Sequence, residues 1–184
     1  MMNVIFYLLI SYLIGTFMTG YIVIRFLYHE DIREKGSGNV GAKNAGRVYG
    51  KRAAVLTFLG DFIKGAIIIV IARYFSFSET MQLVGLLFVI TGHVFPIFLR
   101  WKGGKGIATF LGGITLLNPL LLVPLILVFG ILYVWKRNFT LAGLSAIGIL
   151  PISFYFVNNQ MVNTMLFAVI ALFVLIVHKR GKKL

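Results

Sequence analysis

The chain has 184 residues, of which 59% are hydrophobic and only 12% are charged. A soluble fold of this size could not bury so much apolar surface, so the composition predicts an integral membrane protein without a separate soluble domain. The formal net charge of +13 predicts basic segments that meet anionic lipid headgroups or anionic substrates. Nucleic acid is a poor alternative, because the basic residues are scattered between apolar stretches. The absence of cysteine excludes a disulfide framework, a thiolate nucleophile and a cysteine-based metal site.

The first apolar stretch, residues 4–24, carries no charge and is long enough to cross a bilayer as a helix. No basic segment precedes it and no small-residue cleavage site follows it, so we expect a retained helix and not a signal peptide. Ser11, Gly15 and Thr19 recur at every fourth position. They predict a small-residue face suited to close helix packing.

A glycine-rich loop, residues 36–47, lies between the first two apolar stretches and contains no carboxylate. Gly36, Gly38 and Gly41 permit positive φ, and successive amides in such a turn can form a nest for an anion. Lys43 and Arg47 add positive charge, so the loop predicts a phosphate cradle, with an ordinary turn as the alternative. The same glycine spacing matches a dinucleotide fingerprint, but that motif requires a preceding strand and not a membrane-length apolar stretch.

The second predicted span, residues 53–71, is interrupted by Asp61 and Lys64. Their i, i+3 spacing places both on one helical face, where they can pair. Ionisable groups at membrane depth are costly and usually face a protein interior or a wet cavity. We expect an internal structural ion pair, with a substrate contact as the alternative.

The third predicted span, residues 81–99, ends in a second glycine-rich basic segment at residues 100–106. His93 and Pro96 are expected just inside the end of its helix. The following apolar stretch, residues 107–117, is only about half a membrane thick, and short helices of this kind tend to line sites. The remaining predicted spans are residues 120–135, 141–157 and 161–177.

Seven spans with the N-terminus outside place every lysine and arginine except Lys64 and Arg73 on the cytoplasmic side. So lopsided a distribution fits the positive-inside rule. The sequence therefore predicts one polytopic domain over residues 1–184. It is an all-α bundle of seven transmembrane helices with short or broken helices and glycine-rich cytoplasmic loops. A bundle of this size is expected to be a monomer in the cell membrane.

The basic loops that converge on one face predict an anion site, most simply for phosphate. Arg47 can grip phosphate oxygens bidentately, while Lys102 or Lys105 can act as point charges. No metal constellation is expected, because the three histidines stand far apart without carboxylates at ligand spacing. His93 alone beside a proline is more often structural than a base, and no carboxylate pair suits general acid–base work.

Three segments carry recognisable motifs: residues 36–47 read GSGNVGAKNAGR, residues 92–109 read GHVFPIFLRWKGGKGIAT, and residues 137–141 read RNFTL. Together with Asp61-x-x-Lys64-Gly65 they resemble, in order, the motifs of the PlsY family of bacterial acyl-phosphate:glycerol-3-phosphate acyltransferases. The resemblance runs from residue 36 to residue 141. The second motif matches almost residue for residue.

The resemblance implies a seven-helix enzyme at the inner leaflet. It would transfer a fatty acyl group from acyl phosphate to the 1-hydroxyl of glycerol 3-phosphate, giving lysophosphatidic acid and phosphate without a cofactor. Ser37, His93 and Lys105 are the candidate catalytic residues. The candidate substrate-binding residues are Gly36, Gly38, Asn39, Gly41, Asn44, Arg47, Lys102, Gly103, Gly104, Thr140 and His178.

The chain departs from the family pattern in several places. The family usually has Ser where Thr140 stands, Thr where Lys136 stands, and Asn where Gly181 stands. A catalytically weakened paralog is therefore one alternative to the active acyltransferase. A small transporter or binding protein for phosphorylated solutes is another, because broken helices and anion nests also serve transport. Transporters often show inverted repeats, and the two glycine loops give no convincing repeat.

Overall fold

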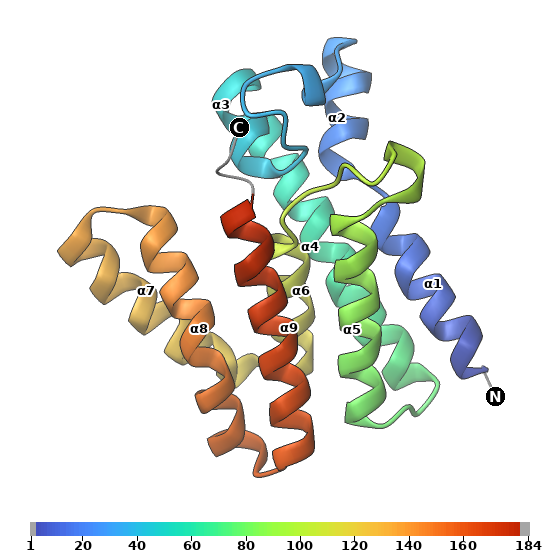
Figure 1. Cartoon of the computed structure of the whole chain (residues 1–184), viewed down its shortest axis with the longest axis vertical. Coiled ribbons are helices and arrows are strands. Elements are labelled where there is room, and N and C mark those ends of the chain that lie inside the picture. The colour runs from blue at the N-terminus through green and yellow to red at the C-terminus, as the bar shows by residue number, and fades with distance from the viewer. Residues whose placement is uncertain (1–2, 181–184) are drawn as a thin grey trace.

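The computed structural model describes residues 3–180, and within that range every regular element is a helix or a short 3-10 turn (Figure 1). Six helical stretches are long and apolar enough to span a membrane, and a seventh apolar helix is shorter. The elements are α1 (Val4–Thr16), α2 (Thr19–Tyr28), η1 (Ile32–Glu34), α3 (Ala42–Tyr49), α4 (Lys51–Tyr74), α5 (Glu79–Val94), η2 (Ile97–Leu99), α6 (Ile107–Leu117), η3 (Pro119–Leu121), α7 (Leu122–Lys136), α8 (Phe139–Asn158) and α9 (Met161–Arg180).

The predicted all-helical membrane fold is confirmed, and each of the seven expected apolar segments coincides with helix. The boundaries differ in three places. The first span is broken at Phe17 and Met18, whose extended backbone separates α1 from α2. The second half of the predicted glycine loop is helix α3, so Lys43 and Arg47 lie on a helix and not in a loop.

The third difference concerns the end of α5. The helix ends at Val94, so Pro96 lies outside it, contrary to the prediction. Proline has no backbone N–H and clashes with the preceding turn of a helix, which explains why the helix does not continue through it. Residues 97–99 then form the short turn η2 before the second glycine-rich segment.

The core is built around two close helix pairs, in which α1 packs against α5 and α4 packs against α6. Glycines make these approaches possible. A side chain at Gly15 or Gly92 would overlap the backbone across the α1–α5 contact, and one at Gly65 or Gly112 would do so across α4–α6. The expected small-residue face of the first span is thus confirmed at Gly15. Large buried side chains fill the rest of this core: Tyr7, Leu83, Leu86, Phe110, Phe154 and Phe167.

The two ends of the bundle differ in character. At one end Glu79 accepts hydrogen bonds from Asn158 (2.6 Å) and Asn163 (3.1 Å), which ties the start of α5 to the α8–α9 turn. Nearby, the Arg73 guanidinium caps the end of α6 by donating to the Leu117 carbonyl at 2.9 Å.

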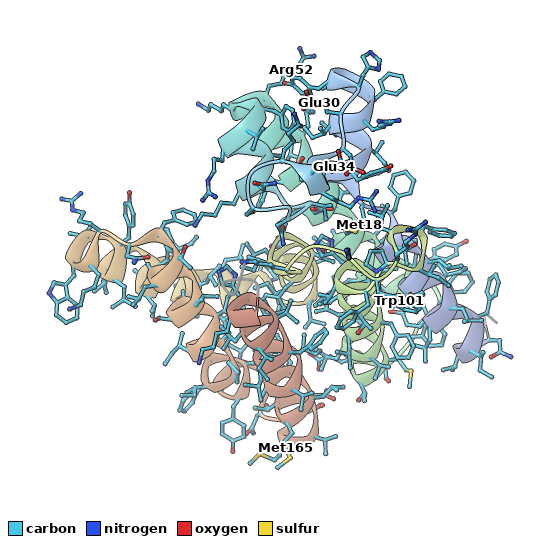
Figure 2. The ribbon with its side chains drawn as sticks, turned by 45° about the horizontal axis from the view of Figure 1, so that its top comes forward. Met18, Glu30, Glu34, Arg52, Trp101 and Met165 are labelled. Atoms are coloured by element: carbon cyan, nitrogen blue, oxygen red, sulfur yellow. The ribbon has the colours of Figure 1, made fainter. Side chains whose placement is uncertain are left out.

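At the other end lie α3, the segment between α5 and α6, the α7–α8 turn and the last turn of α9 (Figure 1). Figure 2 shows Glu30, Glu34 and Arg52 gathered there, with Met165 far away on α9. The predicted convergence of the basic segments on one end of the molecule is therefore confirmed.

Candidate active site

The segment that leads into the first glycine motif is fixed by local ion pairs. Asp31 accepts from the backbone and guanidinium of Arg33, and this bond holds the pKa of the Asp31 carboxyl below its usual range. Glu30 accepts from the Tyr49 hydroxyl at 2.7 Å, which lowers the pKa of Glu30. Burial, together with this bond, raises the pKa of Tyr49 to about 12. The carboxylates of this end are thus engaged with their own neighbours.

An open hollow of about 390 Å³ covers this segment and is lined by Glu30, Asp31 and Glu34 together with Arg25 and Lys35. Three carboxylates around one hollow repel an anion. This hollow is therefore a poor candidate for the predicted anion site.

The glycine motif makes one sharp turn in place of the expected run of three positive φ angles. Gly36 and Gly38 have φ of +59° and +69°, a conformation that favours glycine, as predicted. Gly41 does not: its φ is −85° and its backbone is extended, because it is the N-cap of α3. The prediction of positive φ at Gly41 was therefore wrong.

The amides of this turn are used within the turn itself. Ser37 N–H donates to the Asn44 side-chain oxygen at 2.9 Å, and Gly41 N–H donates to the Asn39 side-chain oxygen at 2.8 Å. Gly38 N–H donates to the Lys35 carbonyl, which Asn44 Nδ2 also reaches at 3.0 Å. The expected nest of inward-pointing amides is therefore absent at these three positions, and both asparagines hold the shape of the turn.

Helix α3 presents its positive charges on the face opposite its buried residues. Asn44 and Ala45 are buried, whereas Lys43 and Arg47 are exposed and lie one turn apart. Within residues 3–180 neither cation is paired with a carboxylate. Lys43 instead donates a 2.9 Å hydrogen bond to the Thr140 hydroxyl. The contact brings α3 to the start of α8 although the two residues are 97 positions apart.

The α7–α8 turn is shaped by two residues that precede Thr140. Arg137 ends α7 in the left-handed conformation, and Asn138 caps α8 by accepting from Leu141 N–H at 3.0 Å. Thr140 therefore sits in the first turn of α8, with its hydroxyl facing Lys43. Thr140 also places the third motif beside the first, as the sequence predicted.

The second glycine-rich segment packs directly on His93. Gly104 N–H donates to the His93 carbonyl at 3.0 Å, and a side chain at Gly104 would overlap the imidazole Nε2. A side chain at Gly103 would overlap the His93 carbonyl. The two glycines are thus required by close packing.

His93 itself lies inside the protein. Its side chain is 3% exposed, and its Nδ1 lies 3.8 Å from the Asp61 carboxylate. This candidate catalytic residue is therefore buried, whereas the candidates Ser37 and Arg47 are exposed. Lys102 is exposed, Lys105 is half-buried, and His178 is 8% exposed near the end of α9. Gly181, where the chain departs from the family pattern, lies outside the described residues.

One functional candidate was missed in the sequence. Lys43 carries charge in the first motif but was not among the candidate site residues, because its bond to Thr140 joins segments that only the fold brings together. Among the described residues no three His, Asp or Glu side chains gather as they would to hold a metal ion.

An apolar groove opens between α1, α5 and α9, next to the second motif. It has a volume of about 260 Å³, and Tyr12 closes one side by donating to the Phe95 carbonyl at 2.9 Å. Phe95 lies two residues after His93, so the groove reaches the base of the glycine-rich segment. The lining residues are Tyr12, Leu87, Phe88, Thr91, Phe95 and Phe173.

Comparison with known proteins now identifies the family. The model of the glycerol-3-phosphate acyltransferase family matches residues 5–183. The chain belongs to this family. It is 45% identical over 173 residues to glycerol-3-phosphate acyltransferase 1 of a Bacillus cereus strain, covering 94% of this chain and 93% of that protein. It is 38% identical to glycerol-3-phosphate acyltransferase 1 of Desulfitobacterium hafniense, covering 96% of this chain and 88% of that protein.

Solved structures agree with the family assignment. The crystal structure of PlsY (YgiH), an integral membrane glycerol 3-phosphate acyltransferase, in its glycerol 3-phosphate form matches with a TM-score of 0.85 at 33% identity. That match covers 97% of this chain and 90% of the crystal chain. The lysophosphatidic acid form of the same protein matches with a TM-score of 0.83. The chain is therefore an integral membrane acyltransferase, as the sequence motifs predicted.

Proposed function

We propose that this acyltransferase transfers a fatty acyl group from an acyl phosphate to the 1-hydroxyl of glycerol 3-phosphate, giving lysophosphatidic acid and inorganic phosphate. Acyl transfer to glycerol 3-phosphate in phospholipid synthesis is the activity of its family. We propose in addition that acyl phosphate is the donor, that the 1-hydroxyl is acylated, and that the residues act as described below. No cofactor is needed, because a mixed anhydride is already activated.

The observation that carries the proposal is the bond between Lys43 and Thr140. It brings α3, whose exposed Lys43 and Arg47 have no carboxylate partner within residues 3–180, to the start of α8. Both helices meet at the end of the bundle where the basic segments gather. Both proposed substrates carry phosphate. A face with two exposed cations one helical turn apart suits a phosphate, which Arg47 can grip bidentately.

The remaining polar candidates complete the proposed phosphate site. Ser37 is exposed at the turn that Asn44 holds, so its hydroxyl can donate to a phosphate oxygen. Lys105 precedes Gly106, whose φ of +75° starts α6, and its ammonium can balance the phosphate that leaves. His178 and Lys102 are proposed to border the substrate and not to react.

The apolar groove supports the other half of the reaction, because a fatty acyl chain must lie against apolar side chains while its phosphate reaches the polar end. We therefore place the chain in the groove beside Phe95 and Phe173. Leu87→Trp narrows the groove and is expected to raise the KM of palmitoyl phosphate more than that of a short-chain acyl phosphate. Ile152→Trp, at an exposed position on α8, is the control and is expected to change neither KM. An equal rise in the KM of both donors would show that the acyl chain does not bind in the groove.

The proposed mechanism is direct attack by the glycerol hydroxyl on the acyl carbonyl. The new ester C–O bond forms, the bond to the phosphate leaving group breaks, and the hydroxyl proton passes to a phosphate oxygen of the substrate. Positioning and charge stabilisation then supply most of the acceleration. A trapped acyl-Ser37 intermediate would contradict this mechanism.

The cytoplasmic site, the outside N-terminus and the monomeric state also belong to the proposal. The chain contains no natural cysteine, so single cysteines can report sidedness. In intact cells an impermeant thiol reagent is expected to label Met161→Cys, at the α8–α9 turn, and to miss Glu34→Cys until the membrane is opened. The reverse labelling pattern would show that the topology is the opposite of the one proposed. A dimer in size-exclusion light scattering would overturn the monomer.

The decisive experiment measures phosphate release by the purified protein from palmitoyl phosphate, with and without glycerol 3-phosphate. We expect release that depends on glycerol 3-phosphate and yields lysophosphatidic acid. Arg47→Ala is expected to abolish it, whereas Arg52→Ala, another exposed arginine at the same end, is expected to retain it. Binding of glycerol 3-phosphate without turnover would instead favour a weakened paralog, and flux of glycerol 3-phosphate into proteoliposomes would favour a transporter.

A further inference from the structure

A buried polar cluster connects α4 to α5 in the interior of the bundle. Asp61 and Lys64 form an ion pair of 3.1 Å, and the exposed fractions of their side chains are 2% and 6%. His93 faces the same Asp61 oxygen at 3.8 Å and is 3% exposed. Ionisable side chains at this depth are costly to keep, so their presence calls for a role.

Lys64 connects this cluster to the break in the first span. Its ammonium donates to the Gly15 carbonyl and to the Phe17 carbonyl, each at 3.1 Å. The end of a helix leaves carbonyls without intrahelical partners, and Lys64 satisfies two of them. Lys64 therefore fixes the α1–α2 break against α4, while the Asp61 carboxylate compensates the positive charge of Lys64.

His93 connects the cluster to the second glycine-rich segment. Its carbonyl accepts from Gly104 N–H, and its imidazole fills the space that a side chain at Gly104 would occupy. The next residue is Lys105, followed by the left-handed Gly106 that starts α6. Any shift of the imidazole must therefore move the backbone that carries Lys105.

We propose that Asp61 is a positioning residue for the acyl transfer. It acts through His93: the carboxylate attracts the imidazole Nδ1, which has no hydrogen-bond partner among the described residues, and the imidazole packs against Gly104. Gly104 in turn sets the position of Lys105 relative to the substrate phosphate. His93 is then a buried support of the site and not its base. The inference rests on the function proposed above, because it assigns a purpose to the same site.

The test requires a variant that neutralises the pair without leaving one buried charge alone. Asp61→Asn with Lys64→Gln keeps polar groups of similar size, and the glutamine amide can still donate toward the Gly15 and Phe17 carbonyls. We expect the KM for glycerol 3-phosphate to rise roughly tenfold, as is typical of changes along a packed network, with a smaller change in kcat. The amide of Gly104 is expected to exchange faster with deuterium.

The matched control is Thr57→Val. Thr57 lies one turn before Asp61 on α4, is fully buried and has a hydroxyl without a hydrogen-bond partner among the described residues. This isosteric change perturbs the same helix face without touching His93. We expect it to leave both the KM and the exchange of Gly104 unchanged. If the Asp61→Asn, Lys64→Gln double variant loses thermal stability but keeps the wild-type KM and the wild-type exchange of Gly104, the inference is overturned.

His93→Gln supplies a second, independent test. If Asp61 acts through His93, adding the Asp61→Asn and Lys64→Gln changes to this variant raises the KM no further. Effects that add would show that Asp61 acts by another route. If the double variant does not fold, His93→Gln alone must still raise the KM and speed the exchange of Gly104.

The failure of this inference and the failure of the proposed function give different results. Wild-type protein without turnover on palmitoyl phosphate and glycerol 3-phosphate contradicts the function. The positioning role is then judged by the Kd for glycerol 3-phosphate, from its thermal stabilisation of the protein, and by Gly104 exchange. Normal wild-type turnover with an unchanged KM in the double variant contradicts only the positioning role.

Discussion

The core formed by α1, α4, α5 and α6 and the hairpin formed by α7 and α8 are built on different principles. In the core, glycines let one helix backbone touch the next: a side chain at Gly65 would overlap the Thr109 carbonyl, and one at Gly112 the Phe62 carbonyl. In the hairpin, side chains at Gly130 and Gly143 would meet nothing within 4 Å among the described residues. Helix α7 also contributes no buried residue to the described part of the chain.

The difference shows which helices of the site are held by close backbone contact. Packing between apolar helices in lipid depends on close van der Waals contact, since lipid is as apolar as the side chains. The core has that contact and carries His93 with the second glycine-rich segment. In the hairpin only α8 has it, through the buried Ile147, Leu150 and Phe154. The start of α8 carries Thr140, which the Lys43 bond holds to α3. The proposed substrate site therefore spans the glycine-packed core and a hairpin whose outer helix, α7, has no buried residue.

The largest expected effect comes from breaking the charge pair in the core. Lys64→Met leaves the Asp61 carboxylate buried without its partner and is expected to cost about 3–5 kcal/mol of stability. Lys35→Met removes a comparable pair at the surface, where the Lys35 and Glu30 side chains are 46% and 43% exposed. That control is expected to cost less than about 1 kcal/mol. Thermal unfolding in detergent measures both, and equal losses would contradict the comparison.

The second largest difference is expected between alanine substitutions of one glycine in each region. Gly112→Ala forces α6 away from α4 and is expected to destabilise the protein by about 3 kcal/mol, at the upper end of what overpacking usually costs. Gly130→Ala, on α7, adds the same methyl group where there is room, so it is expected to change stability by less than about 1 kcal/mol. Unfolding temperatures of the two variants check this. A Gly130→Ala loss as large as that of Gly112→Ala would show that α7 is tightly packed after all.

The third variant tests the polar cluster that joins the start of α9, just after the hairpin, to the start of α5. Asn163 is 3% exposed, donates to Glu79 and Gln160, and accepts from Thr80. Asn163→Ala removes all three hydrogen bonds and leaves Glu79 with Asn158 alone, and we expect a loss of about 2 kcal/mol. The neighbouring Val162 is 71% exposed, so Val162→Ala serves as the control in the same unfolding assay. Equal unfolding temperatures for the two variants would mean that this cluster adds no stability.

The sequence predicted the core better than it predicted the site. Hydropathy and length located the apolar spans, because lipid demands long apolar helices whatever they contact. The spacing of Asp61 and Lys64 also predicted their pairing, since a single helix fixes it. The break at Phe17 has no hydropathy signal, because apolar residues continue through it.

The site was harder to predict because its contacts are tertiary. Residues 42–49 have no run of apolar residues to suggest a helix, yet they form α3 and place Lys43 and Arg47 on one face. The bond between Lys43 and Thr140 depends on how the hairpin folds back. The burial of His93 depends on how closely Gly103 and Gly104 approach it. Neither can be read from local spacing.

A smaller effect is expected where the two regions meet. Thr140→Val removes the acceptor of Lys43, and because this bond is exposed it should cost less than about 1 kcal/mol of stability. Its effect should appear in function, as a rise of roughly tenfold in the KM for glycerol 3-phosphate, which corresponds to about 1.4 kcal/mol. Thr140→Ser keeps the hydroxyl and should keep the KM. An unchanged KM in Thr140→Val would show that the hairpin does not contribute to the substrate site.

The smallest effect concerns the segment before the glycine motif, which neither region holds tightly. The Arg33 guanidinium keeps the pKa of Asp31 below its unfolded value of about 3.9, so the pair's contribution is complete above that value and is lost as the pH falls through the native pKa. Because the pair is near the surface, we expect less than about 1 kcal/mol. Arg33→Gln should lower the unfolding temperature slightly at pH 7 and by less at pH 3, where the contribution of the pair is already declining. A difference that persists unchanged at pH 3 would mean that Arg33 stabilises the segment through its 5.1 Å contact with the Tyr21 ring, because that contact does not depend on the charge of Asp31.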